Sequence, residues 1–282
     1  MKKFIGAILF SIVLSLSCSA ALAENLLQSI EKKHKEMLYP TVLVSLERGA
    51  GSGTVIFSRA IEKTITSLVL TNYHVVAKYV SVEKEWDSSK EKKVDVERKR
   101  PVSVEVFEYN NYSELIGTIG READIVAYDA KRDLALLKIT DTERLMPHVA
   151  KLYPEDKDTG PWIFSNVFAV GAGLGKPPFP TAGFLAGFSK DINGNPLWLA
   201  SAPIIFGNSG GSLFVYSQRG QYELIGVPSM VSSYGWDSAI VPHMAWARPI
   251  TEIRLFLRKN GFGYVLGDVE EKEKKETKDA SE

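Results

Sequence analysis

Short runs of β-branched and aromatic residues, separated by glycine, proline or charged turns, dominate the chain from residue 41 onward. Such runs are typical of strands, and no helical pattern alternates with them. This organisation favours an all-β fold, a sandwich or a barrel. The expected strands cover residues 41–47, 53–58, 66–72, 101–108, 114–120, 123–129, 134–139, 164–170, 183–188, 197–201, 212–216, 222–227 and 239–247.

Two segments show helical patterns instead. Residues 25–37 set four apolar side chains among charged ones, which predicts a short amphipathic helix that ends near Pro40. Residues 249–261 read PITEIRLFLRKNG, with Pro249 near the start and Gly261 at the stop. This arrangement predicts a helix at the C-terminal end of the folded part.

Two further segments are dense in charge. Residues 78–100 are predicted to form an exposed excursion, because such segments usually face solvent. Residues 268–282 alternate acidic and basic side chains without an apolar run, which predicts a disordered tail. With no repeat of fixed period, the simplest division is one domain over residues 24–267 followed by this tail.

The N-terminus has the three parts of a secretory signal peptide. The basic MKK precedes a long apolar run, and Ala-Leu-Ala at 21–23 predicts cleavage before Glu24. A membrane anchor is the alternative, but the apolar run is short for a span and polar sequence follows it. The expected signal peptide is therefore residues 1–23, and the mature protein is expected in the periplasm or the medium without a stable membrane anchor.

Charge and cysteine content exclude several classes of function. The 34 basic and 34 acidic residues give no net charge, so no nucleic-acid partner is expected. Cys18 is the only cysteine and lies in the expected signal peptide. Disulfides, thiolate metal sites and a cysteine nucleophile are therefore excluded from the mature chain. No metal-ligand or phosphate-loop motif is present, so neither metal nor cofactor is expected.

Three separated residues could form a nucleophilic site. Ser209 lies in FGNSGGS, where glycines allow a tight turn with inward N–H groups. His74 follows an apolar strand, and Asp133 precedes another one, with Asp124 and Asp129 as competing carboxylates. Each residue alone is a common structural feature, but a serine, a base and a carboxylate that orients the base are the parts of a catalytic triad.

The motifs TNYHVV, RDLALLKI and GNSGGS resemble the three catalytic motifs of trypsin-like serine proteases, and more closely those of the HtrA (Deg) branch. GAGSGTVIF at 49–57 and AVGAGLGKPPFPTAGFLAGF at 169–188 are similar to further motifs of that branch. The resemblance spans roughly residues 38–260. It implies two packed six-stranded β-barrels, with His74 as general base, Asp133 as its orienter and Ser209 as nucleophile; the candidate oxyanion residues are Gly207, Asn208 and Ser209.

The sequence departs from the family in three respects. PDZ domains, usual in HtrA proteins, are not expected because only fifteen residues, most of them charged, follow Gly267. His74 and Asp133 lie 59 residues apart, a longer separation than the family pattern, and Gly173 replaces a proline of the family motif. A trimer is common in the family and depends on N-terminal contacts that the sequence does not test.

The specificity pocket is expected to accept an apolar side chain. Proteases of this kind choose the residue before the scissile bond (P1) through a pocket beside the nucleophile. Six residues before Ser209, where trypsins carry an aspartate, this chain has Pro203, and a basic P1 would lack a partner. A small or medium apolar P1 is therefore predicted. The candidate wall residues are Pro203, Ile204, Ile205, Ser229 and Met230.

The sequence leaves three functions open. The first is an exported endopeptidase that acts on unfolded or extended polypeptides. The second is a peptide-binding, chaperone-like protein that uses the same cleft without catalysis or in a gated state. The third is a protease directed at one specific target. A switch, if present, would involve the loops at 172–182 or 230–238.

Overall fold

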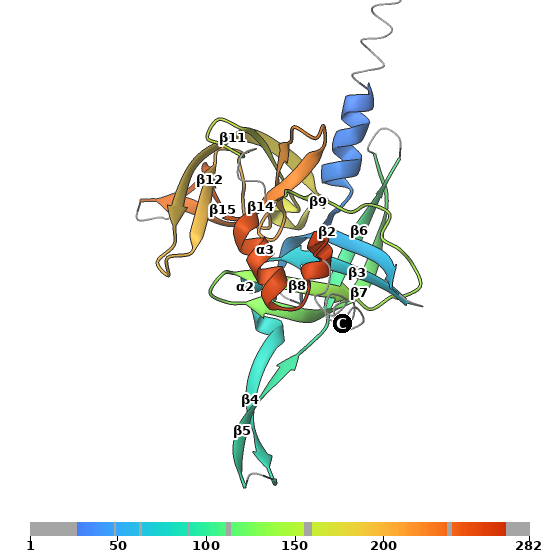
Figure 1. Cartoon of the computed structure of the whole chain (residues 1–282), viewed down its shortest axis with the longest axis vertical. Coiled ribbons are helices and arrows are strands. Elements are labelled where there is room, and N and C mark those ends of the chain that lie inside the picture. The colour runs from blue at the N-terminus through green and yellow to red at the C-terminus, as the bar shows by residue number, and fades with distance from the viewer. Residues whose placement is uncertain are drawn as a thin grey trace, which may run out of the picture.

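The computed structural model of the protein describes residues 27–268, apart from residues 48, 62–63, 90, 111–113, 155–159 and 236–238. Two β-barrels lie against each other, and one helix lies near each end of the described chain (Figure 1). No helix in these residues is long and apolar enough to cross a membrane. The expected signal peptide (1–23) lies outside the described residues, as does the expected tail (268–282) except for its first residue.

The first barrel is a closed antiparallel sheet of six strands. Because side chains alternate between the two faces of each strand, one set fills the interior, and valine supplies most of it. Pairing of the first strand with the sixth closes the ring. In spatial order the strands are β1 (Thr41–Ser45), β2 (Ala50–Ile61), β3 (Thr64–Thr71), β8 (Leu134–Ile139), β7 (Leu115–Asp129) and β6 (Val102–Tyr109).

The second barrel also has six strands. The pairing of β13 with β14 closes this sheet into a barrel. A short seventh strand, β9 (Lys151–Leu152), adds in parallel to β14 and belongs to the segment that connects the barrels. The barrel strands are β13 (Ser212–Tyr216), β10 (Asn166–Gly171), β11 (Phe179–Lys190), β12 (Pro196–Ala200), β15 (Ala239–Pro249) and β14 (Tyr222–Tyr234). The expected architecture of two six-stranded barrels is therefore confirmed.

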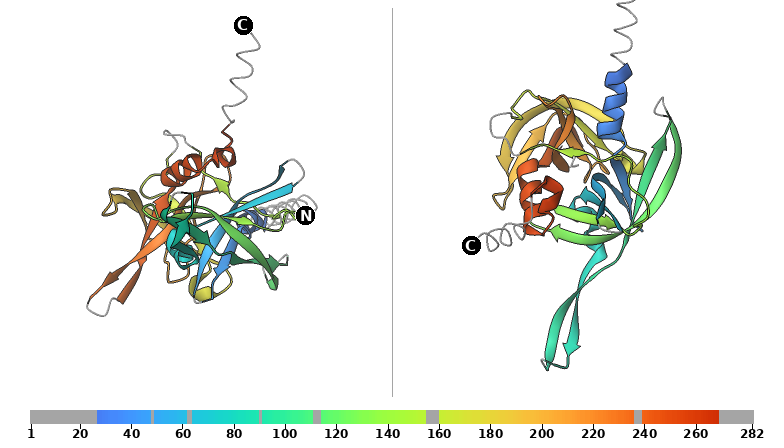
Figure 2. Two further views of the ribbon diagram at one scale, coloured as in Figure 1. Left: turned by 90° about the horizontal axis from the view of Figure 1, so that it is seen from below. Right: turned by 45° about the vertical axis from the view of Figure 1, so that its right-hand side comes forward.

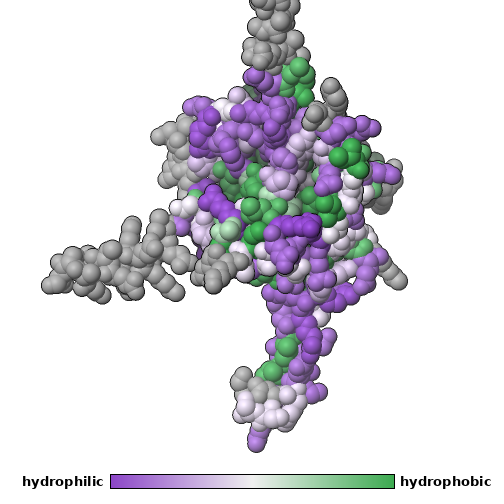
Figure 3. All heavy atoms as spheres, turned by 90° about the vertical axis from the view of Figure 1, so that its right-hand side faces the viewer, coloured by the Kyte–Doolittle hydropathy of each residue, from purple (hydrophilic) through white to green (hydrophobic). Residues whose placement is uncertain are grey.

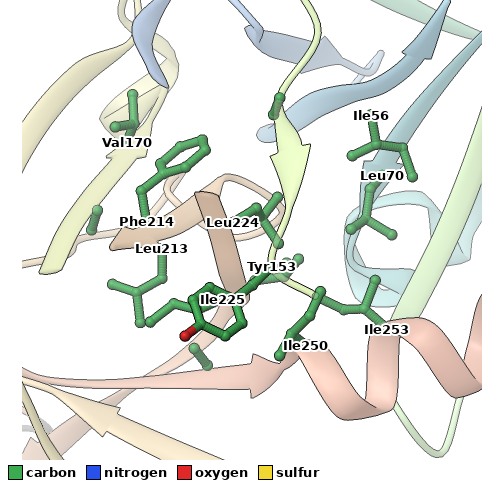
Figure 4. Close-up of a cluster of buried hydrophobic side chains, with 14 of the residues drawn as sticks. Ile56, Leu70, Tyr153, Val170, Leu213, Phe214, Leu224, Ile225, Ile250 and Ile253 are labelled. Atoms are coloured by element: carbon green, nitrogen blue, oxygen red, sulfur yellow. The ribbon is translucent and has the colours of Figure 1, made fainter. Parts of the chain in front are cut away.

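A shared hydrophobic core joins the barrels. Its side chains come from both sheets, from the connecting segment and from the C-terminal helix α3 (Ile250–Lys259). Figure 4 shows Ile56 and Leu70 of the first barrel near Ile253 of α3, with Leu224 of the second barrel facing the same cluster. Burial of this surface at roughly 25 cal/mol per Å² is what holds the cleft between the barrels in place.

Each expected strand overlaps an observed strand, although several run one or two residues past its end, and two of them are fused. Residues 114–120 and 123–129 belong to the single long strand β7, which a register shift between Ile125 and Ala127 bends against β8. Both expected helices are also present. The N-terminal one is α-helical over residues 27–33 and continues as a π-helical turn, η1 (His34–Leu38); α3 is followed by a short 3₁₀ turn, η4 (Gly263–Leu266).

The charged excursion is more regular than its composition suggested. It forms a two-stranded antiparallel hairpin, β4 (Val80–Asp87) and β5 (Lys92–Lys99), that projects from the first barrel (Figures 1 and 2). Figure 3 shows that most of its surface is hydrophilic. Composition predicted the exposure correctly, but cross-strand pairing of alternating valines and charges decides the strand conformation.

Candidate active site

His74 sits in a single helical turn at the end of strand β3. The strand stops at Thr71, Asn72 is extended, and residues Tyr73–Val76 form α2. Val75 and Val76 are buried in the first barrel, whereas 47% of the His74 side chain is exposed. Burial of its neighbours therefore fixes the histidine while its ring stays accessible to solvent.

Asp133 meets His74 from the turn between β7 and β8. Its carboxylate accepts hydrogen bonds from the His74 backbone N–H (2.9 Å), from ring Nδ1 (2.8 Å) and from the Ser229 hydroxyl. Because an ionised carboxylate only accepts, Nδ1 carries the proton and the Nε2 lone pair is left to accept another. The Asp133 backbone has φ +53°, and the Asn72 side-chain amide holds its carbonyl at 2.7 Å.

The competing carboxylate Asp129 has another role. It accepts from the Arg132 guanidinium at 2.9 Å and from the backbone N–H groups of Lys131 and Arg132. Burial raises the pKa of Asp129, but the hydrogen bonds from Arg132 outweigh burial and leave that pKa below its usual value. Asp129 therefore stabilises the turn that presents Asp133.

Ser209 lies on the second barrel, pressed against the strand ends of the first. The Ser52 N–H donates to the Ser209 carbonyl at 2.7 Å. A Cβ at Gly210 would lie 2.1 Å from the Ser52 carbonyl oxygen and 3.2 Å from the Asn72 nitrogen, so only glycine fits there. The structure thus brings the serine loop to the chain segment that leads directly into His74.

The backbone beside Ser209 presents free N–H groups. The Phe206 carbonyl accepts the Leu174 N–H at 2.7 Å, so the Gly207 N–H of the same trans peptide points the opposite way. Among the residues described, neither the Gly207 N–H nor the Ser209 N–H donates to another protein group. Two such donors on one turn are what an oxyanion requires.

Asn208 does not supply a third donor, which corrects the expectation for this residue. Its N–H donates to the Ile205 carbonyl at 3.1 Å, and its side-chain oxygen accepts the Ile205 N–H at 3.1 Å. These two bonds close the turn over residues 205–208 and direct the Asn208 amide into it. The buried Asn208 side chain shapes the loop instead.

Sequence reasoning missed Ser52, which connects the barrels at this point. Its hydroxyl accepts the Ala172 N–H at 2.7 Å and donates to the Gly207 carbonyl at 2.6 Å, while Thr71 holds the Ser52 carbonyl at 2.7 Å. The motif GAGSG contained the signal, since it was identified as part of the resemblance. Its role could not be assigned because the Ser52 partners lie 120 and 155 residues away.

The expected pocket residues lie beside this loop but in different environments. Ile204 is buried and donates its N–H to the Pro242 carbonyl, while the Pro203 carbonyl accepts the Thr181 hydroxyl at 2.7 Å. Met230 is 43% exposed, and Ile205 is half-buried. Ser229 is buried with its hydroxyl on Asp133, so its side chain supports the carboxylate.

No group of three metal-ligating side chains occurs in the described residues. The three other histidines lie apart from the site: His34 and His148 pack around Tyr39, and His243 Nδ1 is 3.2 Å from the Ser201 carbonyl oxygen. The chemistry available at the site is therefore that of a hydroxyl, an imidazole oriented by a carboxylate, and two backbone N–H donors.

Comparison with known proteins agrees with this geometry. The family model described as "Trypsin-like peptidase domain" matches residues 51–227, a range that contains His74, Asp133 and Ser209. No curated protein sequence matches the chain.

Solved structures of HtrA-type and Deg proteases share the fold. The serine endoprotease from Yersinia pestis is 21% identical (TM-score 0.52), and the match covers 84% of this chain and 66% of that one. The HtrA-type protease AlgW with tripeptide is 19% identical (TM-score 0.56), and the match covers 83% of this chain and 64% of that one. Deg5 is 22% identical (TM-score 0.54), and the match covers 82% of this chain and 92% of that one. This chain thus spans about two thirds of the length of the first two proteins.

Proposed function

Since this chain belongs to the trypsin-like peptidase family, we propose that it is an exported serine endopeptidase with His74, Asp133 and Ser209 as its catalytic triad. Three observations support the proposal: the Asp133 carboxylate lies on His74 Nδ1, the N–H groups of Gly207 and Ser209 are unengaged in the described chain, and the Ser209 loop packs on the segment that leads into His74. Ser52, Asn72 and Ser229 are positioning residues, because each acts through another member of the site.

The first half-reaction forms an acyl-enzyme. Ser209 Oγ attacks the scissile carbonyl carbon as its proton moves to His74 Nε2. The resulting oxyanion accepts hydrogen bonds from the N–H groups of Gly207 and Ser209. The carbon–nitrogen bond then breaks, and His74 gives the proton to the departing amine. Asp133 stabilises the imidazolium during both transfers.

The second half-reaction restores the enzyme. Water gives a proton to His74 Nε2 as its oxygen attacks the acyl carbon, and the same two N–H groups hold the second oxyanion. The ester bond breaks, and the proton returns from His74 to Ser209 Oγ. Each step uses only groups of the site, so no cofactor is required by this mechanism.

We propose an apolar P1 residue of small or medium size. The segments 201–206 and 229–235, which border the Ser209 loop, contain no acidic residue. Buried Ile204 and half-exposed Met230 offer apolar surface. A basic P1 side chain would lose hydration there without gaining a counter-ion, whereas Val or Leu would gain from burial.

Extended or unfolded polypeptides are the proposed substrate class, and export follows from the N-terminal motif. Acylation requires a backbone that can enter the cleft, which unfolded chains provide at little cost. The structure of the HtrA-type protease AlgW with tripeptide supports peptide binding by this fold. The alternative, a chaperone-like protein that binds peptides without cleaving them, uses the same cleft and differs only in turnover.

The proposal is tested by measuring the cleavage of denatured β-casein by the chain from Glu24 onward and by its Ser209→Ala variant. Removing the nucleophile is expected to lower kcat by about 10⁶-fold, as in subtilisin. Arg59→Gln is a matched control, because Arg59 is exposed, lies outside the site and has no carboxylate partner in the described chain. If wild type and Ser209→Ala both bind casein and neither cleaves it, the binding protein is the correct alternative.

A reporter series tests the specificity. Among peptides that differ only at P1, those with Val or Leu should have a kcat/KM about tenfold or more above that of the Lys peptide, because an unpaired buried charge is costly. Equal kcat/KM for Lys and Val reporters would overturn the apolar pocket while leaving the triad intact.

A further inference from the structure

A cavity of about 510 Å³ lies on the first barrel, outside the catalytic cleft. It is bounded by strands β6 and β7, by the residue that follows η1, and by the segment 144–148. This volume is in the range of small-molecule sites. The residues that carry the argument are Tyr39, Phe107, Tyr109, Arg121, Arg144 and His148.

One wall of the cavity is aromatic. The rings of Tyr39 and Tyr109 are stacked, with centroids 5.2 Å apart and an interplanar angle of 18°. The His148 ring lies 4.8 Å from Tyr39 at 56°. The Tyr109 hydroxyl is buried and has no partner in the described chain, and burial raises the pKa of Tyr109 to about 12. Such a wall offers stacking or edge contacts to a flat ring.

The mouth of the cavity carries the exposed guanidinium of Arg144. Asp141 is paired with Arg121 and also interacts electrostatically with Arg144, but no carboxylate in the described chain lies within ion-pair distance of Arg144. The one acidic residue that lines the described cavity is Glu108. Ile116 (64% exposed) and Leu145 (54% exposed) stand at the rim without cover. A ligand that joins an apolar ring to an anionic group would complement both features, since guanidinium binds carboxylates with two donors.

The back of the cavity touches the catalytic machinery. Phe107 shares a buried cluster with Leu43 and with Ala172, which follows β10, and Tyr109 packs against this cluster. The Ala172 N–H donates to the Ser52 hydroxyl, which donates to the Gly207 carbonyl at 2.6 Å. A displacement of the aromatic wall would therefore reach the Gly207 peptide through two hydrogen bonds.

We propose that this cavity binds an aromatic carboxylate, with the ring on the Tyr39–Tyr109 wall and the carboxylate on Arg144, and that its occupancy alters the oxyanion site through Ala172 and Ser52. The ligand is either a free small molecule or the C-terminal aromatic residue of a peptide, because both carry the same chemistry. The coupling rests on the proposed peptidase function, whereas the binding does not.

Titration calorimetry with the Ser209→Ala chain tests the binding without turnover. The probes are N-acetyltyrosine, its uncharged analogue N-acetyltyrosinamide, and N-acetylleucine, which lacks the ring. N-acetyltyrosine is expected to bind about tenfold or more tightly than either analogue, as one charge-assisted contact and one ring contact predict. A tyrosine-terminated hexapeptide and its C-terminal amide distinguish the two sources of ligand.

Arg144→Gln, made in the Ser209→Ala chain, locates the binding. It should weaken N-acetyltyrosine by about tenfold or more, while the control Arg59→Gln should leave affinity unchanged. Saturable binding that Arg144→Gln does not weaken would place the ligand in the catalytic cleft and overturn the proposal. No saturable heat with any probe would overturn it as well.

The coupling is measured on the active chain with a short peptide reporter. Saturating N-acetyltyrosine is expected to change kcat at least twofold, and Arg144→Gln should abolish the change without altering basal kcat. Binding with an unchanged kcat would overturn the coupling and keep the site. A chain that is inactive towards every substrate would contradict the proposed function, and the calorimetry would still decide the binding.

Discussion

At the scale of single residues, the site depends on backbone carbonyls that two donors hold in place, one from each barrel. Ser52 donates to the Gly207 carbonyl, and Leu174 donates its N–H to the Phe206 carbonyl. Leu174 has φ +56°, an uncommon conformation for a β- or γ-branched side chain, and it is 66% exposed. Strain of this kind persists only where neighbouring contacts impose it. Here the strained conformation directs the Leu174 N–H at the Phe206 carbonyl and so orients the Phe206–Gly207 peptide.

Gly207→Ala is expected to remove most activity. Gly207 has φ +95°, and a Cβ there would lie 2.6 Å from the Ala172 oxygen and 2.7 Å from the Leu174 nitrogen. The Phe206–Gly207 peptide must therefore move, and loss of one oxyanion donor lowers kcat by about 10²–10³-fold. A peptide reporter measures the loss, with Gly120→Ala as control because no atom lies within 4 Å of its Cβ position. Full activity of Gly207→Ala would refute the oxyanion assignment.

The buried ion pair of Asp191 and Arg248 predicts an acid-dependent stability. The pair is 2.8 Å apart, with side chains 9% and 6% exposed. Burial would raise the pKa of Asp191, but hydrogen bonds from Asn195, Arg248 and Asn193 hold that pKa at about 2. Since the folded pKa lies below the unfolded one, this stability is complete above about pH 4 and is lost as the pH falls towards 2.

Arg248→Met tests the pair by urea unfolding. At pH 7 it should destabilise the fold by about 3 kcal/mol, because it leaves Asp191 buried without its counter-ion. The difference between wild type and variant should shrink between about pH 4 and pH 2, where protonation removes the charge of Asp191. A difference that stays constant over this range would show that the pair does not titrate as described.

At the scale of elements, the β4–β5 hairpin is a separable addition to the first barrel. The Arg100 N–H donates to the Tyr79 carbonyl at 2.9 Å, so the hairpin leaves and re-enters the barrel at adjacent points. Its contacts with the body lie at its base: Val80 packs against the core of the first barrel, Glu97 accepts the Tyr128 hydroxyl, and Lys99 lies over the Tyr128 ring at 5.3 Å. Tyr128 in turn stacks on Tyr73, beside His74.

Replacing residues 80–99 by Asn-Gly should leave the fold intact. A two-residue link closes the gap that the Tyr79–Arg100 bond already spans, and an isolated hairpin contributes little stability of its own. The melting temperature is expected to shift by no more than about 4 °C, roughly 1 kcal/mol, with reporter kcat/KM within about twofold. Circular dichroism melting and the reporter assay check this; a variant that fails to fold would make the hairpin part of the barrel core.

The elements also show where sequence patterns are sufficient. The observed strands lie where the sequence has runs of β-branched residues, because the local pattern of apolar residues already indicates which segments are buried. The fusion of 114–120 with 123–129 did not follow, since only pairing with β6 and β8 shows that the strand is continuous. The hairpin at 80–99 was likewise missed because its stability depends on register between two charged strands.

At the scale of the whole molecule, the two barrels are expected to unfold together. One buried cluster contains Leu70 of β3, Leu213 of β13 and Ile253 of α3, so each barrel buries part of its apolar surface only against the rest of the molecule. Scanning calorimetry should give one transition with equal calorimetric and van't Hoff enthalpies. Two separated transitions would contradict this shared core.

Ile253→Ala gives the matched test of that core. Ile253 is fully buried, so its truncation should cost about 2–5 kcal/mol and lower the single transition as a whole. Leu255 lies on the same helix but is 45% exposed, so Leu255→Ala should change the stability little. A destabilisation confined to one part of the melting curve would again separate the barrels.

The sequence by itself determined the strand-rich fold and the identity of the residues for the chemistry. The runs of valine and isoleucine specify buried strands locally, and TNYHVV, RDLALLKI and GNSGGS carry recognisable residue types in a fixed order. Tertiary structure alone decided how these parts act on one another. The Ser229 hydroxyl on Asp133, the Ser52 hydroxyl on Gly207 and the Leu174 N–H on Phe206 join residues 32 to 155 positions apart. Such contacts depend on which surfaces two closed barrels bring together, and no local pattern of hydrophobic and polar residues encodes that.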